Sequence, residues 1–187
     1  MSDIFSLKVE ELASKIKDAQ LTSVEICETY LERIKKFEKD VKAWAHFDKK
    51  LLLEKAAESD EYRRSGKPLG PLHGIPIALK DIIGTVDMPT ECGTVIRKGK
   101  SFSQNAEIVD LLLSAGAIVM GKTATSELAF LGPSKTTNPH DHSRTPGGSS
   151  SGSAASVASF MAPLSIGSQT GGSVIRPCLL YTSPSPR

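Results

Sequence analysis

A serine that directly follows two glycines is the first candidate for chemistry in this sequence. Ser173 follows Gly171 and Gly172 within the segment Gly-Ser-Gln-Thr-Gly-Gly-Ser-Val-Ile-Arg-Pro at residues 167–177. Glycines let the backbone adopt conformations closed to other residues, and they let amide N–H groups approach a ligand closely. Such a turn suits an oxyanion hole beside a serine nucleophile. The alternative is a tight turn with an incidental serine, and this segment alone does not decide between the two.

Two further segments carry residue types that could act with this serine. Lys80 and Asp81 follow the apolar run Ile-Pro-Ile-Ala-Leu at residues 75–79, which we expect to be a buried strand. Ser149 lies in Pro-Gly-Gly-Ser-Ser-Ser-Gly-Ser at residues 146–153. Taken alone, the lysine and the aspartate could be an exposed pair, and the glycine- and serine-rich stretch could be a flexible linker. The small apolar residues after this stretch instead predict a buried helix, which indicates that the stretch joins core elements.

Together, these three segments resemble the motifs of the amidase signature family. Their order and context agree, and their joint occurrence is much more specific than any single glycine-rich stretch. The similarity extends from the amphipathic N-terminal helix to Pro177. By this resemblance, Ser173 is the acyl-accepting nucleophile, Ser149 is a bridging serine held through a cis peptide bond, and Lys80 is the base. The separation of 24 positions between residues 149 and 173 fits the serine pair of the family.

The chemistry that the resemblance implies depends on the protonation of Lys80. An unaided serine hydroxyl is a poor nucleophile, so a base must remove its proton as it attacks an amide carbonyl. A lysine can do this only when it is neutral. Burial would have to lower its pKa by about 3 from the ordinary value of about 10.4, which is a preference of about 4 kcal/mol against the charged form. Ser149 would then relay the proton between Lys80 and Ser173.

Neighbouring residues have supporting roles by the same resemblance. The backbone N–H groups of Thr170, Gly171 and Gly172, with that of the nucleophile itself, are candidate oxyanion donors. We expect Arg176 to hold the nucleophile loop through an ion pair, in preference to touching substrate. Ser150 either hydrogen-bonds within the site or satisfies local backbone groups.

Two features stand outside this pattern. Gln169 occupies a position at which many family members have an acidic residue, and the sequence does not show which subgroup this change indicates. His140, Asp141 and His142 could be read as metal ligands. A short loop with two histidines and no distant third ligand is a weak indication of a metal site, so we expect solvated loop residues there. The resemblance implies no metal and no organic cofactor.

Composition and charge restrict the class of protein. The 187 residues are 39% hydrophobic and 24% charged, which is enough apolar material for one substantial core. A net charge of +2 without a basic stripe argues against direct contact with nucleic acid. No apolar run is long enough to cross a bilayer, and no secretory signal is visible. The cysteines Cys27, Cys92 and Cys178 are odd in number and widely spaced, which suits reduced thiols better than disulfide bonds. We therefore expect a cytoplasmic protein that acts on a small-molecule amide, without membrane association.

Helical and strand patterns predict an α/β core, and the resemblance implies the amidase signature fold, in which a mixed β-sheet core is flanked by helices. Thr22 and Glu25 form a capping-box pattern ahead of an amphipathic helix, and Gly116 is expected to end another helix. A Gly-Lys-Thr turn is expected at residues 121–123. Helices are expected at residues 7–19, 22–37, 48–64, 107–115 and from 154 onward, and strands at 75–79, 117–120 and within 162–167.

We expect residues 1–177 to be the N-terminal part of a single amidase domain, truncated before the C-terminal half that completes the family's sheet. Residues 178–187 abandon the preceding pattern, and we treat them as a suspect, non-native tail. The expected parental activity is hydrolysis of a carboxamide to a carboxylate and ammonia or an amine, with the fragment itself inactive.

Two other functions remain open on the sequence. Within the family, the chain could be the A-type subunit of a glutamine-dependent tRNA amidotransferase, which would have partner subunits; a homo-oligomer is the other expected assembly. Outside the family, a noncatalytic module could bind an anion in its glycine-rich turns. Those glycine-rich turns lack the Gly-Lys-Ser/Thr end of a phosphate loop, which counts against this last reading.

Overall fold

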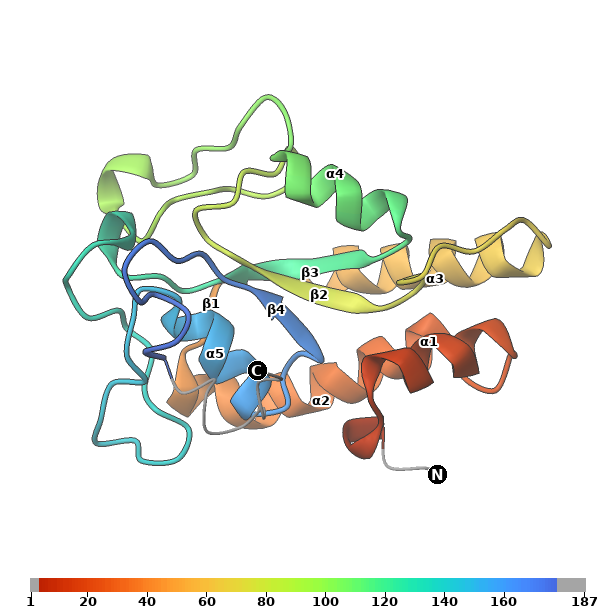
Figure 1. Ribbon diagram of the computed structural model, residues 1–187, viewed down its shortest axis with the longest axis horizontal. Coiled ribbons are helices and arrows are strands. Elements are labelled where there is room, and N and C mark those ends of the chain that lie inside the picture. The colour runs from red at the N-terminus through yellow and green to blue at the C-terminus, as the bar shows by residue number, and fades with distance from the viewer. Residues whose placement is uncertain (1–3, 178–187) are drawn as a thin grey trace.

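Four strands form a mixed β-sheet with helices on both sides (Figure 1). The computed structural model describes residues 4–177. The α-helices are α1 (Val9–Lys17), α2 (Ser23–Val41), α3 (Lys49–Arg64), α4 (Glu107–Ser114) and α5 (Ser151–Ala158). The strands are β1 (Trp44–Phe47), β2 (Pro76–Lys80), β3 (Ile118–Thr123) and β4 (Leu164–Ile166), and short 3-10 helices cover Ile4–Ser6, Val95–Arg97 and Glu127–Ala129.

The strands lie in the order β1-β3-β2-β4. β2 is parallel to both β3 and β4, whereas β1 runs antiparallel to β3. Lys80 is the last residue of β2 and pairs with Thr123, the last residue of β3. Because β2 and β3 are parallel, the segments that follow them leave the sheet at the carboxyl ends of the strands. α/β proteins bind ligands at this end of the sheet. The predicted α/β fold with a mixed sheet is confirmed.

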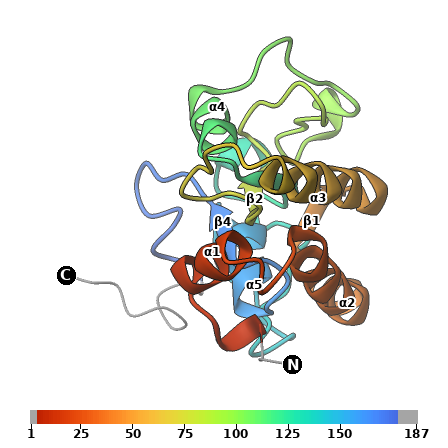
Figure 2. The same ribbon diagram turned by 90° about the vertical axis from the view of Figure 1, so that its right-hand side faces the viewer.

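Helices cover the two faces of the sheet unequally. α4 lies on one side, and α1, α2 and α5 lie on the other, as two perpendicular views show (Figure 1, Figure 2). α3 packs against both α2 and β3. No helix within residues 4–177 is both long and apolar enough to span a bilayer.

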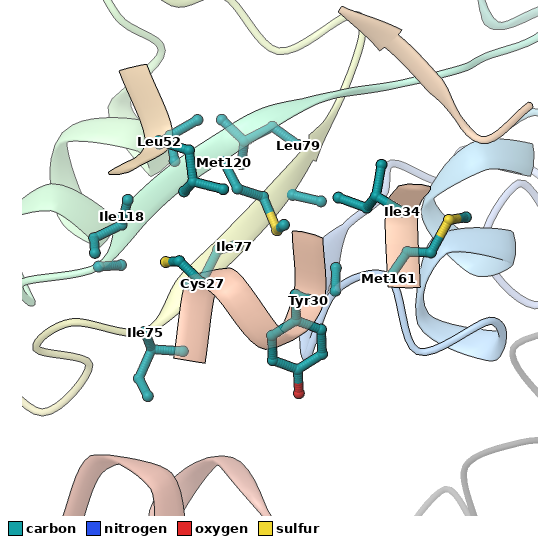
Figure 3. Close-up of a cluster of buried hydrophobic side chains, with 14 of the residues drawn as sticks. Cys27, Tyr30, Ile34, Leu52, Ile75, Ile77, Leu79, Ile118, Met120 and Met161 are labelled. Carbon is teal, nitrogen blue, oxygen red and sulfur yellow. The ribbon is translucent and has the colours of Figure 1, made fainter. Parts of the chain in front are cut away.

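The main core lies between α2 and the two central strands (Figure 3). Cys27, Tyr30 and Ile34 recur at helical spacing on α2 and are buried. Cys27 lies beside Ile77 of β2, whereas the Tyr30 ring points away from the strands and packs edge-on against Phe5. Each large apolar side chain that is fully buried contributes about 1.5 to 3 kcal/mol. This helix also begins as predicted, because the side chains of its capping box, Thr22 and Glu25, accept hydrogen bonds from each other's backbone N–H groups.

One expectation about local structure is wrong. The Gly-Lys-Thr at residues 121–123 is not a turn but the end of β3. Gly121 is needed for close packing, since a Cβ there would lie 2.8 Å from the carbonyl oxygen of His46 on β1. The serine-rich stretch joins core elements, as predicted, because α5 begins within it at Ser151 and buries most of its residues. The strand β1 has no counterpart among the predicted elements.

Candidate active site

Lys80 meets two serines from distant parts of the chain. Its side chain is fully buried at the end of β2. Its Nζ lies 2.7 Å from Ser149 Oγ, 2.8 Å from Ser168 Oγ and 3.4 Å from the carbonyl oxygen of Ser168. The amine is therefore surrounded by neutral oxygen atoms. Among the described residues, no carboxylate forms an ion pair with it.

Burial determines the charge preference of Lys80. Removal from water lowers its pKa from 10.5 to about 8, because a cation loses hydration in the interior. This is the direction that a general base requires, although the value lies above the one we estimated from the sequence. The alternative of an exposed Lys80–Asp81 pair is wrong, since neither side chain is more than 1% exposed. The Asp81 carboxylate instead accepts hydrogen bonds from the backbone N–H groups of Glu91 and Gly93.

Ser149 stands between the glycine-rich segment and α5. The peptide bond between Gly148 and Ser149 is cis, as the family resemblance implied. Only 2% of Ser149 is exposed, and its carbonyl oxygen accepts a hydrogen bond from the Ser126 N–H. Gly148 is required by close packing, because a Cβ there would lie 2.8 Å from Ser126 Oγ.

Ser150 joins the start of α5 to the segment that carries Ser173. Its backbone N–H donates to the Ser173 carbonyl oxygen at 3.1 Å. Its hydroxyl donates to the Ser168 carbonyl oxygen at 3.1 Å and accepts from the Ser168 N–H at 3.2 Å. Ser150 thus lies within the site and also satisfies backbone groups there, so the two alternatives from the sequence are not exclusive.

The segment before Ser173 presents free backbone donors. Within residues 4–177, the N–H groups of Thr170, Gly171, Gly172 and Ser173 donate no hydrogen bond. Thr170 and Gly171 are exposed, whereas Gly172 and Ser173 are buried, with 9% of Ser173 accessible. These groups are available to a ligand, as an oxyanion hole requires.

Arg176 and Gln169 hold this segment in shape. The backbone N–H and Nε of Arg176 both donate to the Gly172 carbonyl oxygen, at 2.9 and 3.2 Å. The ion pair expected for Arg176 is not found among the described residues. Gln169 Oε1 accepts from the N–H groups of Val174 and Ile175 at 3.0 and 2.9 Å. The Gln169 side chain therefore accepts these two hydrogen bonds without the negative charge that an acidic residue would carry at this position.

A small cavity opens beside Ser149. It has a volume of about 180 Å³ and is bordered by Gly147, Gly148 and Arg176 from the segments described above. Its remaining lining comes from Thr145, Ser126 and the loop at residues 130–133. Leu128, Phe130 and Leu131 in this region are between 60 and 79% exposed. Neither Ser149 nor Ser173 lines the cavity, which adjoins their segments through Gly147, Gly148 and Arg176.

Comparison with known proteins matches this arrangement to one family. The sequence profile of the Amidase family matches residues 25–181. The chain belongs to this family. The A-type subunit of glutamyl-tRNA(Gln) amidotransferase from Streptomyces coelicolor is 41% identical over 185 residues, which are 95% of this chain and 37% of that protein. The corresponding protein of Chloroflexus aurantiacus is 39% identical over 186 residues and is covered to 38%.

Solved structures of amidases share the fold. Peptide amidase from Stenotrophomonas maltophilia superimposes with a TM-score of 0.86 at 36% identity, over 92% of this chain and 38% of that one. Fatty acid amide hydrolase superimposes with a TM-score of 0.84 at 30% identity, over 91% of this chain and 31% of that one. This amidase-family chain thus spans less than two fifths of the length of these relatives.

The sequence analysis missed one residue that contacts Lys80 and one further buried lysine. Ser168 contacts Lys80, yet nothing in its spacing from Ser173 indicates that its hydroxyl reaches a residue 88 positions earlier. Lys122 is a second fully buried lysine, on β3. Its Nζ donates to the Ile83 carbonyl oxygen at 2.7 Å and to Thr90 Oγ1 at 2.6 Å. The burial of Lys122 was not predicted because residues 121–123 were expected to form a turn.

The histidine-containing loop lies apart from the site. His140, Asp141 and His142 are exposed, as expected for solvated loop residues. Hydrogen bonds from Ser143 lower the pKa of the Asp141 carboxyl group, which also pairs with Arg144 at 2.9 Å. Residues 4–177 contain no group of three or more histidine, cysteine, aspartate or glutamate side chains placed to hold a metal ion. The tail at 178–187, with Cys178, lies outside the described residues, so its non-native origin stays a prediction.

Proposed function

We propose that the protein hydrolyses a carboxamide to a carboxylate and ammonia or an amine, through an acyl-enzyme on Ser173. The observation that carries this proposal is the buried contact of 2.7 Å between Lys80 Nζ and Ser149 Oγ, in surroundings that lower the pKa of the lysine. Membership in the Amidase family supports the same chemistry. A noncatalytic anion site would have no use for a neutral amine.

In the proposed reaction, the Ser173 hydroxyl attacks the amide carbon while its proton passes to Ser149. The Ser149 proton passes in turn to the lone pair of Lys80, which becomes an ammonium. The free N–H groups at residues 170–173 stabilise the negative oxygen of the tetrahedral intermediate. The Lys80 proton then returns through Ser149 to the leaving nitrogen as the C–N bond breaks.

Water completes the proposed cycle. It attacks the acyl carbon on Ser173, giving up a proton along the same path, and the carboxylate leaves as the serine regains its hydrogen. We place this reaction in the cytoplasm, since the cysteines Cys27 and Cys92 are free thiols. The small cavity beside Ser149 is the proposed position for one end of the amide.

A substitution tests the proposal most directly. The source DNA is first read through the codons for Pro177 and Cys178 and onward, and the complete reading frame is expressed. The protein is then assayed on a panel of linear amides. Ser173→Ala should abolish turnover, whereas Ser143→Ala, a matched change in the exposed loop, should leave it unchanged. Equal turnover by Ser173→Ala and the original protein would contradict the proposal.

We further propose that residues 1–187 alone do not turn over amides. The curated relatives use a chain of which this one covers 37%. The exposed Leu128, Phe130 and Leu131 beside the cavity also leave apolar surface uncovered. Turnover by residues 1–187 expressed alone, at the rate of the complete reading frame, would refute this.

A second candidate function is the A-type subunit of a glutamine-dependent tRNA amidotransferase. The identity of 41% to a protein of that name favours it. In this case the same serines would release ammonia from glutamine for partner subunits. Ammonia release from glutamine that depends on added amidotransferase partner subunits would support this function, and partner-independent hydrolysis of other amides would favour the first.

A further inference from the structure

The number of hydrogen-bonding partners around Lys80 limits how its amine can be oriented. A neutral amine has two N–H donors and one lone pair. Among the described residues, Lys80 Nζ has three oxygen neighbours, namely the hydroxyls of Ser149 and Ser168 and the carbonyl oxygen of Ser168. The carbonyl oxygen can only accept, so it takes one N–H. One hydroxyl must then accept the second N–H, and the other donates to the lone pair.

Ser168 is held so that both of its oxygen atoms face the amine. It follows β4 after one glycine, and the Ser150 hydroxyl bridges its backbone N–H and carbonyl oxygen. Gly167 is required for this approach, because a Cβ there would lie 2.9 Å from Ser150 Oγ. Ser168 Oγ can therefore take the second N–H at the same time as its carbonyl oxygen takes the first.

We infer that Ser168 is a positioning residue that binds the two N–H groups of neutral Lys80 and so directs the lone pair at Ser149. This inference rests on the proposed function, because a directed lone pair matters only if Ser149 must give up its proton. By this inference, the segment before Ser173 orients the Lys80 amine in addition to supplying oxyanion donors.

The chemistry of the Ser168 side chain suits this task. A hydroxyl accepts from the amine without adding a charge, so the interior continues to favour the neutral form. A carboxylate at the same place would pair with the ammonium and favour the charged form. A methyl group would leave one N–H without an acceptor, and the lone pair would lose its fixed direction. Threonine keeps the hydroxyl.

The experiment uses the complete protein with Ser168→Ala, Ser168→Thr and Ser168→Asp. Two quantities are measured: kcat and KM as functions of pH, and the pKa of Lys80 by NMR of ¹⁵N-labelled lysine side chains, assigned through Lys80→Arg. Ser165→Ala is the matched control, since Ser165 lies on β4 and its buried hydroxyl has no partner among the described residues.

We expect Ser168→Ala to lower kcat by about 10- to 100-fold with little change in KM, as fits a group that acts through the base. Ser168→Thr should stay within about threefold of the original protein. Ser168→Asp should raise the Lys80 pKa. The acidic limb of the plot of kcat against pH should then move to higher pH by at least about one unit, so that turnover at a given pH on that limb falls about tenfold. Its activity should recover in more alkaline solution.

The outcomes separate this inference from the proposed function. If Ser173→Ala abolishes turnover but Ser168→Ala and Ser165→Ala behave alike, the inference about Ser168 is wrong and the proposed function stands. If the complete protein turns over no amide, the proposed function is wrong. If Ser168→Asp also leaves the Lys80 pKa unchanged, the inference that the Ser168 side chain binds the Lys80 amine is wrong as well. Thermal unfolding checks each variant, and the near-isosteric Ser168→Cys replaces Ser168→Ala if the latter does not fold.

Discussion

Two fully buried lysines lie at or next to the ends of adjacent strands of the sheet, yet their surroundings differ. Lys80 on β2 and Lys122 on β3 are both inaccessible to solvent, and burial lowers the pKa of each to about 8. Lys80 contacts the hydroxyls of two serines. Lys122 contacts the Ile83 carbonyl oxygen and Thr90 Oγ1, with the charge of Asp81 near enough to favour its protonated form.

This comparison shows that burial alone does not identify a base. Hydroxyl partners can give up a proton to an amine and can also rotate to find other partners. The Thr90 hydroxyl already donates to the Ile83 carbonyl oxygen at 3.5 Å, so both partners of Lys122 accept from it, and Lys122 is fixed as a donor that closes the loop between β2 and α4. We therefore expect the chemistry to depend on Lys80 and the stability of the fold to depend on Lys122.

The largest expected effect is on turnover in Lys80→Met. A general base contributes about 10²- to 10⁴-fold, and we expect a loss in that range for kcat in the complete protein. Lys122→Met, a change of the same size on the neighbouring strand, should retain most of the activity of each folded molecule. The measurement is amide hydrolysis per folded protein, and equal losses in the two variants would remove the distinction between the lysines.

The second effect is on stability, which we expect to fall more in Lys122→Met than in Lys80→Met. Lys122→Met removes the Nζ donor at 2.7 Å from the Ile83 carbonyl oxygen and leaves that oxygen only the Thr90 hydroxyl at 3.5 Å, and losing such a buried hydrogen bond costs about 1 to 3 kcal/mol. We expect the free energy of unfolding in urea to fall by about 2 kcal/mol. Lys80→Met should change it less, because the two serine hydroxyls can turn toward other oxygen atoms. A larger loss in Lys80→Met would reverse this assignment.

The third effect is on the pH dependence of stability. Since the pKa of Lys80 falls from 10.5 to about 8 on folding, the unfolded chain binds more protons between these values. The free energy of unfolding therefore gains a contribution that rises with pH across this interval and is absent below it. Cys27 titrates in the opposite sense, because burial raises its pKa to about 12. The quantity to measure is thus the difference between the original protein and Lys80→Met, from pH 7 to 10.

The same titration governs turnover. Neutral Lys80 becomes the major form above pH 8, so kcat/KM should rise with pH and level off above about this value. Lys122→Met should show the same profile, since its lysine takes no part in the proton path. A profile that moves with Lys122 and not with Ser168 would indicate that the wrong lysine has been assigned as the base.

The smallest expected effect is that of Gln169→Glu. The carboxylate keeps an oxygen that can accept from the N–H groups of Val174 and Ile175, and the side chain is exposed. We expect the free energy of unfolding to change by less than about 0.5 kcal/mol, which is usual for surface substitutions. A large loss of turnover with unchanged stability would show that the neutral side chain matters to the charge of the site.

The sequence was informative where a local pattern corresponds to a local structure. The capping box at Thr22 and the apolar recurrence through Ile34 predicted α2, since both depend on residues within a few positions of each other. Lys80 and Ser149 were found through motifs, and the structure brings their side chains together. Their catalytic roles remain predictions until the substitutions above are made.

Features set by distant contacts could not be predicted in this way. Gly121 reads as a turn residue, but the nearby backbone of β1 is the reason for its lack of a side chain. The short strand Trp44–Phe47 is defined by its pairing with β3, and no alternating pattern marks it. Ser168 is one serine among many, and only the path of β4 places its hydroxyl beside Lys80.

The long sequence separations within the site bear on how the protein matures during synthesis. Lys80 leaves the ribosome well before Ser149 and Ser168, which lie 69 and 88 positions later. A nascent chain is made at about 5 to 20 residues per second, so the lysine waits several seconds for its partners. Until β4 joins β2, the base and the nucleophile belong to separate parts of an unfinished chain. The contacts of Lys80 with Ser149 and Ser168 can therefore form only after these later segments have been made.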